Sequence, residues 1–135
     1  MSQAIKALDQ LISSMQPDLH AQPYVYCCLE AVRVDQVADL QPLATINEVE
    51  GMTLIIPLHI AEDRELTYQG PYAAITLNVH SSLDAVGLTA AVAGELAKHE
   101  ISANMLAGFY HDHILVGWDS RHQAMSALQG MMANR

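Results

Sequence analysis

Hydrophobic and polar residues alternate strictly along residues 73–80. The apolar positions are Ile75, Leu77 and Val79, and polar residues stand between them. A period of two places successive side chains on opposite faces of a strand. The pattern therefore predicts a strand with one buried face, which ends at Val79 and is followed by a polar turn.

The segment that follows has helical periodicity. Apolar residues recur at intervals of three and four between Leu83 and His99, which predicts an amphipathic helix over 83–99. The predicted buried row consists of Val86, Ala90, Ala93 and Ala97, flanked by Leu83, Val92 and Leu96. Because alanine is small, we expect this helix to lie close to a sheet.

The remaining elements are shorter. The second half predicts a strand over 101–110, a turn at His111-Asp112, a returning strand over 113–116 and a last helix capped by Asp119 or Ser120. The first half predicts a helix through Met15 that Ser2 caps and Pro17 ends, a strand over 24–29, a helical turn over 34–40, a hairpin of 43–46 and 52–56 around Glu50-Gly51, and a short helix over 58–66.

The order of these elements predicts the fold class. Strand, helix, two strands and helix in the second half form the ferredoxin-like βαββα arrangement. Residues 52–57 and 112–117 have the same role after a tight turn, which indicates a repeated unit, although chance similarity between β-rich segments is an alternative. We predict an α+β fold of two such halves, 1–69 and 70–135, with antiparallel sheets and helices on one face.

Composition and charge exclude several classes of partner. The 135 residues include six Lys and Arg against fifteen Asp and Glu, for a net charge of −9. Nucleic-acid binding requires a cationic surface, and so does binding to an anionic membrane. We therefore expect neither partner. Hydrophobic residues make up 51% of the chain, which suggests apolar area left over for a partner subunit, in a homodimer or higher homo-oligomer.

The cysteines and the N-terminus favour a cytoplasmic protein. Cys27 and Cys28 are adjacent, so on a strand they point to opposite faces and do not pair with each other. We expect both to be small buried residues of a protein in a reducing compartment. The sequence begins without the charged region and apolar stretch of a signal peptide, and no apolar run is long enough to predict a membrane span.

Several segments resemble one known family. Residues 75–90, ITLNVHSSLDAVGLTA, are similar to the first strand, loop and helix start of ACT domains. Residues 101–105 and 111–116 resemble the second and third strands of those domains. The whole chain resembles a bacterial family of short, stand-alone tandem ACT-like proteins of unassigned function, whose N-terminal signature is similar to residues 48–54 here. A more distant likeness runs to aspartate kinase regulatory domains and to Castor-type arginine sensors.

The resemblance implies a regulatory module that binds an amino acid, usually between ACT units. One departure leaves the ligand's identity open. Common ACT domains have an Asp-Arg-Pro-Gly-type loop after the first strand, whereas residues 80–87 form a longer loop without Arg or Pro.

This loop has a physical reason to bind a carboxylate. The first N–H groups of a helix lack intrahelical partners, and the helix dipole favours an anion there. Ser81 or Ser82 can add a hydroxyl, Gly87 permits close approach to the backbone, and Asp84 or Asp112 can balance an ammonium. The predicted ligand-binding residues are His80, Ser81, Ser82, Asp84, Val86, Gly87, Asn104, His111 and Asp112. The alternative is that Ser82 only caps the helix and Asp84 is a first-turn acid.

The histidines suggest a further alternative. His80, His111 and His113 lie near Asp112, but a metal site needs three or four ligands in good geometry, and a His-x-His pair at a turn has low specificity. No phosphate loop, nucleophile elbow or metalloprotease motif is present.

The sequence therefore predicts a non-catalytic regulatory protein that senses a small molecule, with an amino acid as the expected ligand and no cofactor. Two alternatives remain open: a protein-interaction module without a small ligand, and a metal-dependent enzyme that uses His80, His111 and His113.

Overall fold

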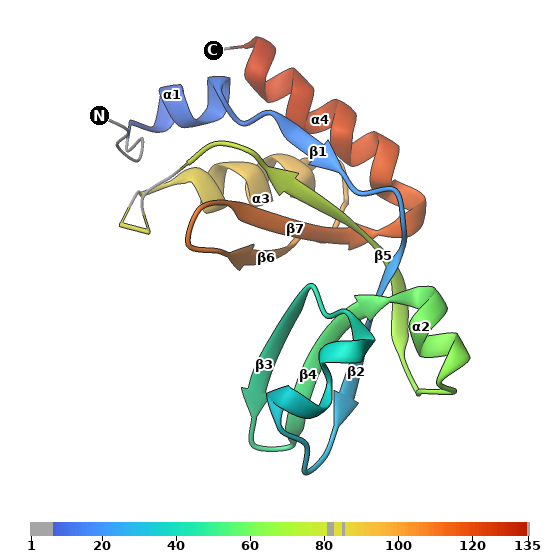
Figure 1. Cartoon of the computed structure of the whole chain (residues 1–135). Helices are drawn as coiled ribbons and strands as arrows, with labels where there is room; N and C mark the ends of the chain where they lie inside the picture. The colour runs from blue at the N-terminus through green and yellow to red at the C-terminus, as the bar shows by residue number, and fades with distance from the viewer. Residues whose placement is uncertain (1–6, 81–82, 85, 135) are drawn as a thin grey trace. The chain divides into compact units, whose positions relative to one another are not determined.

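The computed structural model describes residues 7–80, 83–84 and 86–134, which form two compact units (Figure 1). The first unit contains the described residues up to His20 and those from Ala73 onward, and the second is Ala21–Tyr72. One strand, β5 (Gln69–Leu77), contributes its beginning to the second unit and its end to the first. The predicted division at 69/70 stays a prediction. The compact units are grouped in another way, with the described residues up to His20 in the same unit as those from Ala73 onward.

The first unit has a four-stranded antiparallel arrangement in the order β1-β5-β7-β6. Its elements are α1 (Leu8–Ser13), β1 (Pro17–Leu19), the end of β5, α3 (Leu88–Lys98), β6 (Asn104–Ala107), β7 (Asp112–Gly117), the 3-10 turn η3 (Trp118–Ser120) and α4 (Arg121–Ala133). From β5 onward the order is βαββα, which confirms the predicted ferredoxin-like half.

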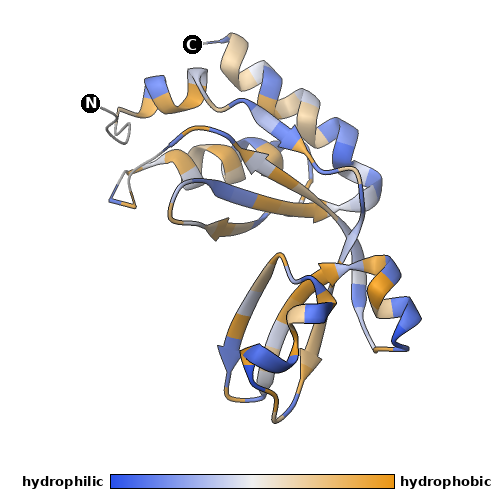
Figure 2. Ribbon diagram, viewed as in Figure 1, coloured by the Kyte–Doolittle hydropathy of each residue, from blue (hydrophilic) through white to orange (hydrophobic). Residues whose placement is uncertain are grey.

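One hydrophobic core joins the sheet of this unit to its three helices. Ile75 and Leu77 from β5 lie in it with Ile114 and Val116 from β7. The helices contribute Leu11, Ile12, Leu88, Val92, Leu96, Ala124, Leu128 and Met131. Alternate strand residues therefore face the helices, which cover one side of the sheet as predicted. Figure 2 shows the apolar second half of β7 following its polar start.

Helix α3 differs from its prediction in two respects. It begins at Leu88 rather than Leu83, because Gly87 has φ 102° and the helix starts only after it. Its buried stripe is Leu88, Val92 and Leu96, while Ala90 and Ala97 are exposed. The large side chains bury more apolar area than alanine, so they face the core and the predicted alanine row does not.

The second unit is a smaller sheet in the order β3-β4-β2-β5. Its elements are β2 (Tyr24–Leu29), the 3-10 turns η1 (Val34–Gln36) and η2 (Ala38–Leu40), β3 (Ala44–Glu48), β4 (Gly51–Pro57), α2 (Leu58–Asp63) and the start of β5. Strand β2 has the predicted bounds, and the predicted hairpin is formed by β3 and β4 with Glu48 opposite Gly51. The 3-10 turns and α2 pack through Val37, Leu40, Ile60 and Ala61 onto Val25, Cys27, Leu54 and Ile56.

Several local predictions need correction. Strand β5 ends at Leu77, before Val79. Strand β6 is much shorter than 101–110, because the Ile101 N–H bonds the Leu96 carbonyl at the end of α3 and the Gly108 N–H bonds the His111 carbonyl in the following turn. Helix α2 ends at Asp63. Cys27 is buried as expected, but Cys28 points to the other face of β2 and is exposed. The predicted cap Ser2 lies outside the described residues. No helix within the described ranges is long and apolar enough to cross a membrane.

Candidate functional site

The end of β5 and the turn between β6 and β7 meet at a group of aromatic and imidazole rings. His111 donates from Nδ1 to the carbonyl oxygen of Val79 at 3.3 Å, which fixes the proton of that ring on Nδ1. The ring of His80 lies 5.4 Å from that of Tyr110, and the Tyr110 ring lies 6.4 Å from that of His111. The structure thus brings together His80 and His111, which the sequence analysis placed in one site.

A hydrogen-bonded chain of side chains crosses three strands beside this group. The Thr76 hydroxyl oxygen lies 2.8 Å from Nε2 of His20 and 2.9 Å from Nδ1 of His113. A hydroxyl has one proton to donate, so at least one of these two nitrogens carries a proton and donates it to the Thr76 oxygen; the ring tautomers decide which one. The chain links the segment after β1 to β5 and β7, and it holds His113 next to Asp112 in a defined orientation.

Burial sets the charge of this cluster. Desolvation raises the pKa of the Asp112 carboxyl above 3.8, and nearby His113 and His111 oppose this rise. Desolvation lowers the pKa of His113 below 6.5, helped by His20 and His111 and opposed by Asp112. In both residues the cost of burying a charge outweighs their mutual attraction, so the cluster favours neutral imidazole at His113.

The lowered pKa of His113 predicts a pH-dependent stability. The folded protein binds fewer protons than the unfolded chain below pH 6.5, so the contribution of His113 is complete above that pH and is lost as the pH falls through the folded pKa. We expect the free energy of unfolding, measured in urea titrations, to decrease from pH 7.5 to pH 5.5. The size of the decrease depends on how far folding lowers the pKa of His113.

The control for this titration is His113→Asn, whose side-chain amide does not titrate and offers both a donor and an acceptor to the Thr76 hydroxyl. It should flatten the pH profile between these limits. Titration of Asp112 has the opposite effect on stability, because its pKa is raised in the folded protein: it lowers the free energy of unfolding as the pH rises, and it does so nearer pH 3.8. An unchanged slope in the variant would contradict the assignment to His113.

The amino end of α3 lies at the far end of the predicted ligand loop. Gly87 has φ 102° and is the residue before the helix, and its carbonyl accepts the first intrahelical bond from Ala91 N at 2.8 Å. No described side chain caps this helix. The N–H groups of Leu88, Thr89 and Ala90 therefore precede the first intrahelical bond and are the groups that can bind an anion.

The later start of α3 changes the roles of several predicted residues. Asp84 lies in an exposed turn, four residues before the helix, so it is not a first-turn acid, and Ser82 is not the residue before the helix. Ser81 and Ser82 themselves lie outside the described residues. Val86 is 83% exposed.

Asn104 lies apart from the other candidates. Its side-chain amide donates to the Leu115 carbonyl oxygen at 3.3 Å. Leu115 is three strand residues beyond Asp112, a separation of roughly 10 Å along β7. The structure therefore groups His80, His111 and Asp112 but not Asn104.

The histidines do not assemble into a metal centre. Within residues 7–80, 83–84 and 86–134, no three His, Cys, Asp or Glu side chains converge closely enough to hold an ion. His113 instead uses Nδ1 to bond Thr76, and His111 uses Nδ1 to bond a backbone carbonyl.

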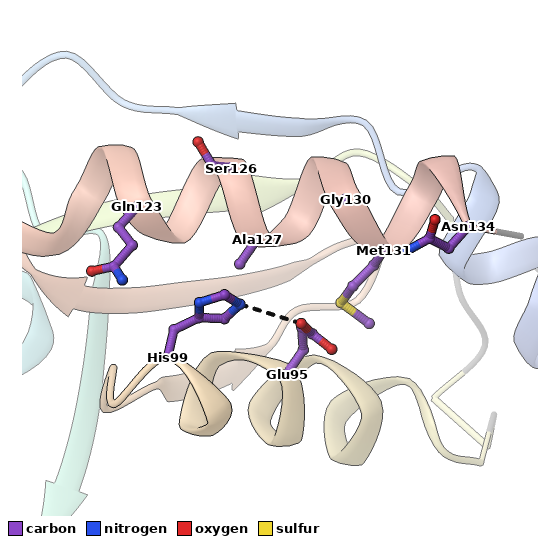
Figure 3. A pocket seen from close by; sticks show the side chains of 8 residues that line it. All are labelled: Glu95, His99, Gln123, Ser126, Ala127, Gly130, Met131 and Asn134. Atoms are coloured by element: carbon purple, nitrogen blue, oxygen red, sulfur yellow. Dashed lines mark ion pairs between the residues drawn. The ribbon is translucent and has the colours of Figure 1, made fainter.

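The grooves on the helical side of the first unit include two that no described residue of the predicted ligand site lines. One, of about 270 Å³, runs between α3 and α4 (Figure 3). It is lined by Glu95, His99, Gln123, Ser126, Ala127, Gly130, Met131 and Asn134. The other is lined by Asp9, Gln10 and Ser13 of α1 and again by Asn134.

No pattern in the sequence marks His20, Thr76 or the residues of these grooves as neighbours. His20 comes after a strand of three residues, too short to leave a periodic pattern. Its partner Thr76 is 56 residues away, so only the pairing of β1 with β5 brings the two together.

Comparison with known families agrees with this architecture. One ACT-domain family model matches residues 3–73, and another matches residues 69–130. The chain belongs to the ACT-domain family. Its two ACT matches stand in tandem, as the sequence segments predicted. None of the proteins with curated functions is significantly similar in sequence to this ACT protein.

Solved structures share the fold of this ACT protein. A Vibrio cholerae protein of unknown function, described as a possible transport protein, is 43% identical over 94% of this chain and 97% of its own, with a TM-score of 0.84. The regulatory subunit of aspartate kinase from Thermus flavus is 9% identical over 85% of this chain and 95% of its own, with a TM-score of 0.62. An Agrobacterium tumefaciens protein is 13% identical over 82% and 84%, with a TM-score of 0.69. The last two show likeness of fold, and the predicted likeness to aspartate kinase regulatory domains is confirmed at that level.

Proposed function

We propose that this ACT protein is a non-catalytic, cytoplasmic regulator that binds an amino acid. The observation that carries the proposal is the tandem match to ACT domains over residues 3–73 and 69–130. Its fold is shared by an aspartate kinase subunit described as regulatory. The described residues of the candidate site supply hydrogen-bonding groups and one partly buried carboxyl, which suit recognition of a small polar molecule.

The proposed ligand site is the loop 80–87 together with His111 and Asp112. The ligand carboxylate would bind the N–H groups in the first turn of α3, where no described side chain competes. No Lys or Arg occurs in residues 78–88 or 108–113, so these backbone groups are the natural anion binders there. The ligand ammonium would bind Asp112 and lower the pKa that burial raises. Asn104 is left out because its amide bonds Leu115.

Regulation would follow from a change in assembly. Leu83, Val86, Phe109 and Tyr110 are large apolar residues between 61% and 83% exposed, and all four lie on the two loops of the proposed site. Their burial in a homodimer would bring a partner subunit onto the ligand loops. A ligand that binds this assembled state more tightly would shift the equilibrium toward it.

A thermal-shift screen against the twenty amino acids tests the proposal. At a free concentration ten times the dissociation constant, a true ligand should add about 1.4 kcal/mol to the stability of the folded protein. Asp112→Asn should abolish the shift, whereas Asp119→Asn, an exposed change of the same charge, should retain it. Flat curves for all twenty, or an undiminished shift in Asp112→Asn, would contradict the proposed site.

The exposed apolar loops also favour a second candidate, a protein-interaction module without a small ligand. The exposed residues Leu83, Val86, Phe109 and Tyr110 would then contact a different protein. This alternative predicts that no amino acid shifts the thermal midpoint in the screen. It also predicts a monomer by light scattering, because the loops would bind a different protein and not a second copy of the chain.

A further inference from the structure

Among the described residues that line the groove between α3 and α4, one is formally charged. Glu95 is the only carboxylate of these eight residues, and none of the eight is Lys or Arg. The Glu95 side chain is 28% exposed and points from α3 toward α4 (Figure 3). A carboxylate in a partly closed groove without a cation in the wall attracts a positive ligand.

The present partners of Glu95 are weak competitors. Its oxygens lie 3.4 Å from His99 Nε2 and 3.6 Å from Lys98 Nζ, both longer than a good charged hydrogen bond. Lys98 is 76% exposed, so its ion pair is largely screened by water. His99 is charged only when protonated. A ligand can therefore displace His99 or Lys98 from Glu95 at a small cost in free energy.

Part of the groove's wall on α4 is small and apolar, beside the polar Gln123 and Ser126. Ala127, Gly130 and Met131 lie opposite Glu95 and His99 (Figure 3). A Cβ placed on Gly130 would meet nothing within 4 Å, which shows open space at the centre of this wall. A short aliphatic chain can pack here against the methyl and thioether groups.

The carboxyl end of α4 adds a second attraction for cations. Asn134, the residue that follows the helix, lines the groove, and no basic side chain stands in the last turn of α4. The negative end of the helix dipole therefore lies at the groove without compensation from the helix's own residues.

We propose that this groove is a second ligand site, which binds a small aliphatic primary amine as its ammonium ion. The ammonium takes the place of His99 and Lys98 at Glu95, and the hydrocarbon chain lies along Ala127, Gly130 and Met131. The volume of about 270 Å³ is below the range usual for drug-sized ligands and suits a metabolite of a few carbon atoms. None of its lining residues belongs to the proposed amino-acid site, so each of the two proposals can be tested independently of the other.

Titration of the full chain with n-butylamine, followed by amide NMR at pH 7 and constant ionic strength, tests this site. We expect saturable shifts of the Gln123 and Asn134 side-chain amides and of Gly130, in the millimolar range that suits so small a ligand. Sodium butanoate, which has the same chain length and the opposite charge, should cause none of them. Equal binding of butanoate, or amine shifts spread over the acidic surface without saturation, would overturn the proposal.

Two pairs of variants make the test specific. Glu95→Gln should weaken amine binding about tenfold, while Glu62→Gln, an equal loss of charge at an exposed position of α2, should leave it unchanged. Gly130→Leu should block the groove, whereas Gly94→Leu, on α3 outside the lining, should not. Neither glycine has a neighbour within 4 Å of an added Cβ, so both variants should fold, as their spectra will show. Retained binding in Glu95→Gln and Gly130→Leu would exclude this groove as the site.

Discussion

Leu11→Ala is expected to lower the free energy of unfolding by about 3 kcal/mol. Leu11 lies in α1 near the start of the chain, is 0% exposed and belongs to the same core as Ile114 and Leu128. Truncation to alanine removes buried methyl groups and leaves a cavity that the rigid sheet cannot fill. Urea denaturation followed by circular dichroism measures the loss.

Leu8→Ala is the matched control, because it changes the same residue type in the same helix. Leu8 is 37% exposed, so its truncation should cost about 1 kcal/mol or less.

A fragment of residues 70–135 extends this test. It lacks α1 and β1 and should not unfold cooperatively, since Leu11, Ile12 and Met15 no longer cover its core. Equal effects of the two leucine variants, or a cooperatively folded fragment, would show that α1 is dispensable to this unit.

Gly108→Ala is expected to destabilise the protein by about 2 kcal/mol and to disturb the candidate site. A Cβ at this position would lie 2.7 Å from the His111 carbonyl oxygen, which is a backbone atom that cannot move aside freely. That oxygen also accepts the Gly108 N–H at 2.9 Å, so the clash opens the β6–β7 turn. The displacement would carry His111 away from Val79.

Gly117→Ala, at the other end of β7, is the control for this effect. An added Cβ there meets nothing within 4 Å, and its backbone has φ −53°, which alanine adopts easily. We expect its stability to change by no more than about 0.5 kcal/mol. Urea midpoints report the stability of both variants, and the imidazole NMR signals of His111 report the site. Equal destabilisation by the two substitutions would contradict the close contact in the turn.

Local patterns in the sequence predicted the bounds of β2 and the buried face of β5, but they missed β1 and gave β6 too long. The β-rich run after Pro23 has the observed bounds of β2, and the alternation through Ile75 and Leu77 identifies the buried face of β5. A strand's side-chain period depends only on neighbouring residues, so the sequence carries it directly. The segments similar to ACT domains likewise indicated a family that the comparisons then showed.

The start of α3 was less predictable, because Leu83 and Val86 fit a helical period although they precede the helix. Leu83 and Val86 are exposed instead of buried, and the glycine at 87 decides where the helix begins. Periodicity reports which residues are apolar, but it does not show whether the backbone conformation of one glycine interrupts the helix.

By itself, the sequence indicated the α+β class, the order of most elements and the net negative charge, because these depend on composition and on neighbouring residues; its resemblance to known ACT domains indicated the family. Only the tertiary structure shows that α1 and β1 belong to the same unit as the second half and that His20 and His113 both contact the Thr76 hydroxyl. It also shows that Asn104 lies apart from the histidines and that a groove is present at Glu95. Each of these features depends on contacts between residues far apart in the chain. Such contacts are fixed by the packing of the core as a whole, and no local periodicity encodes them.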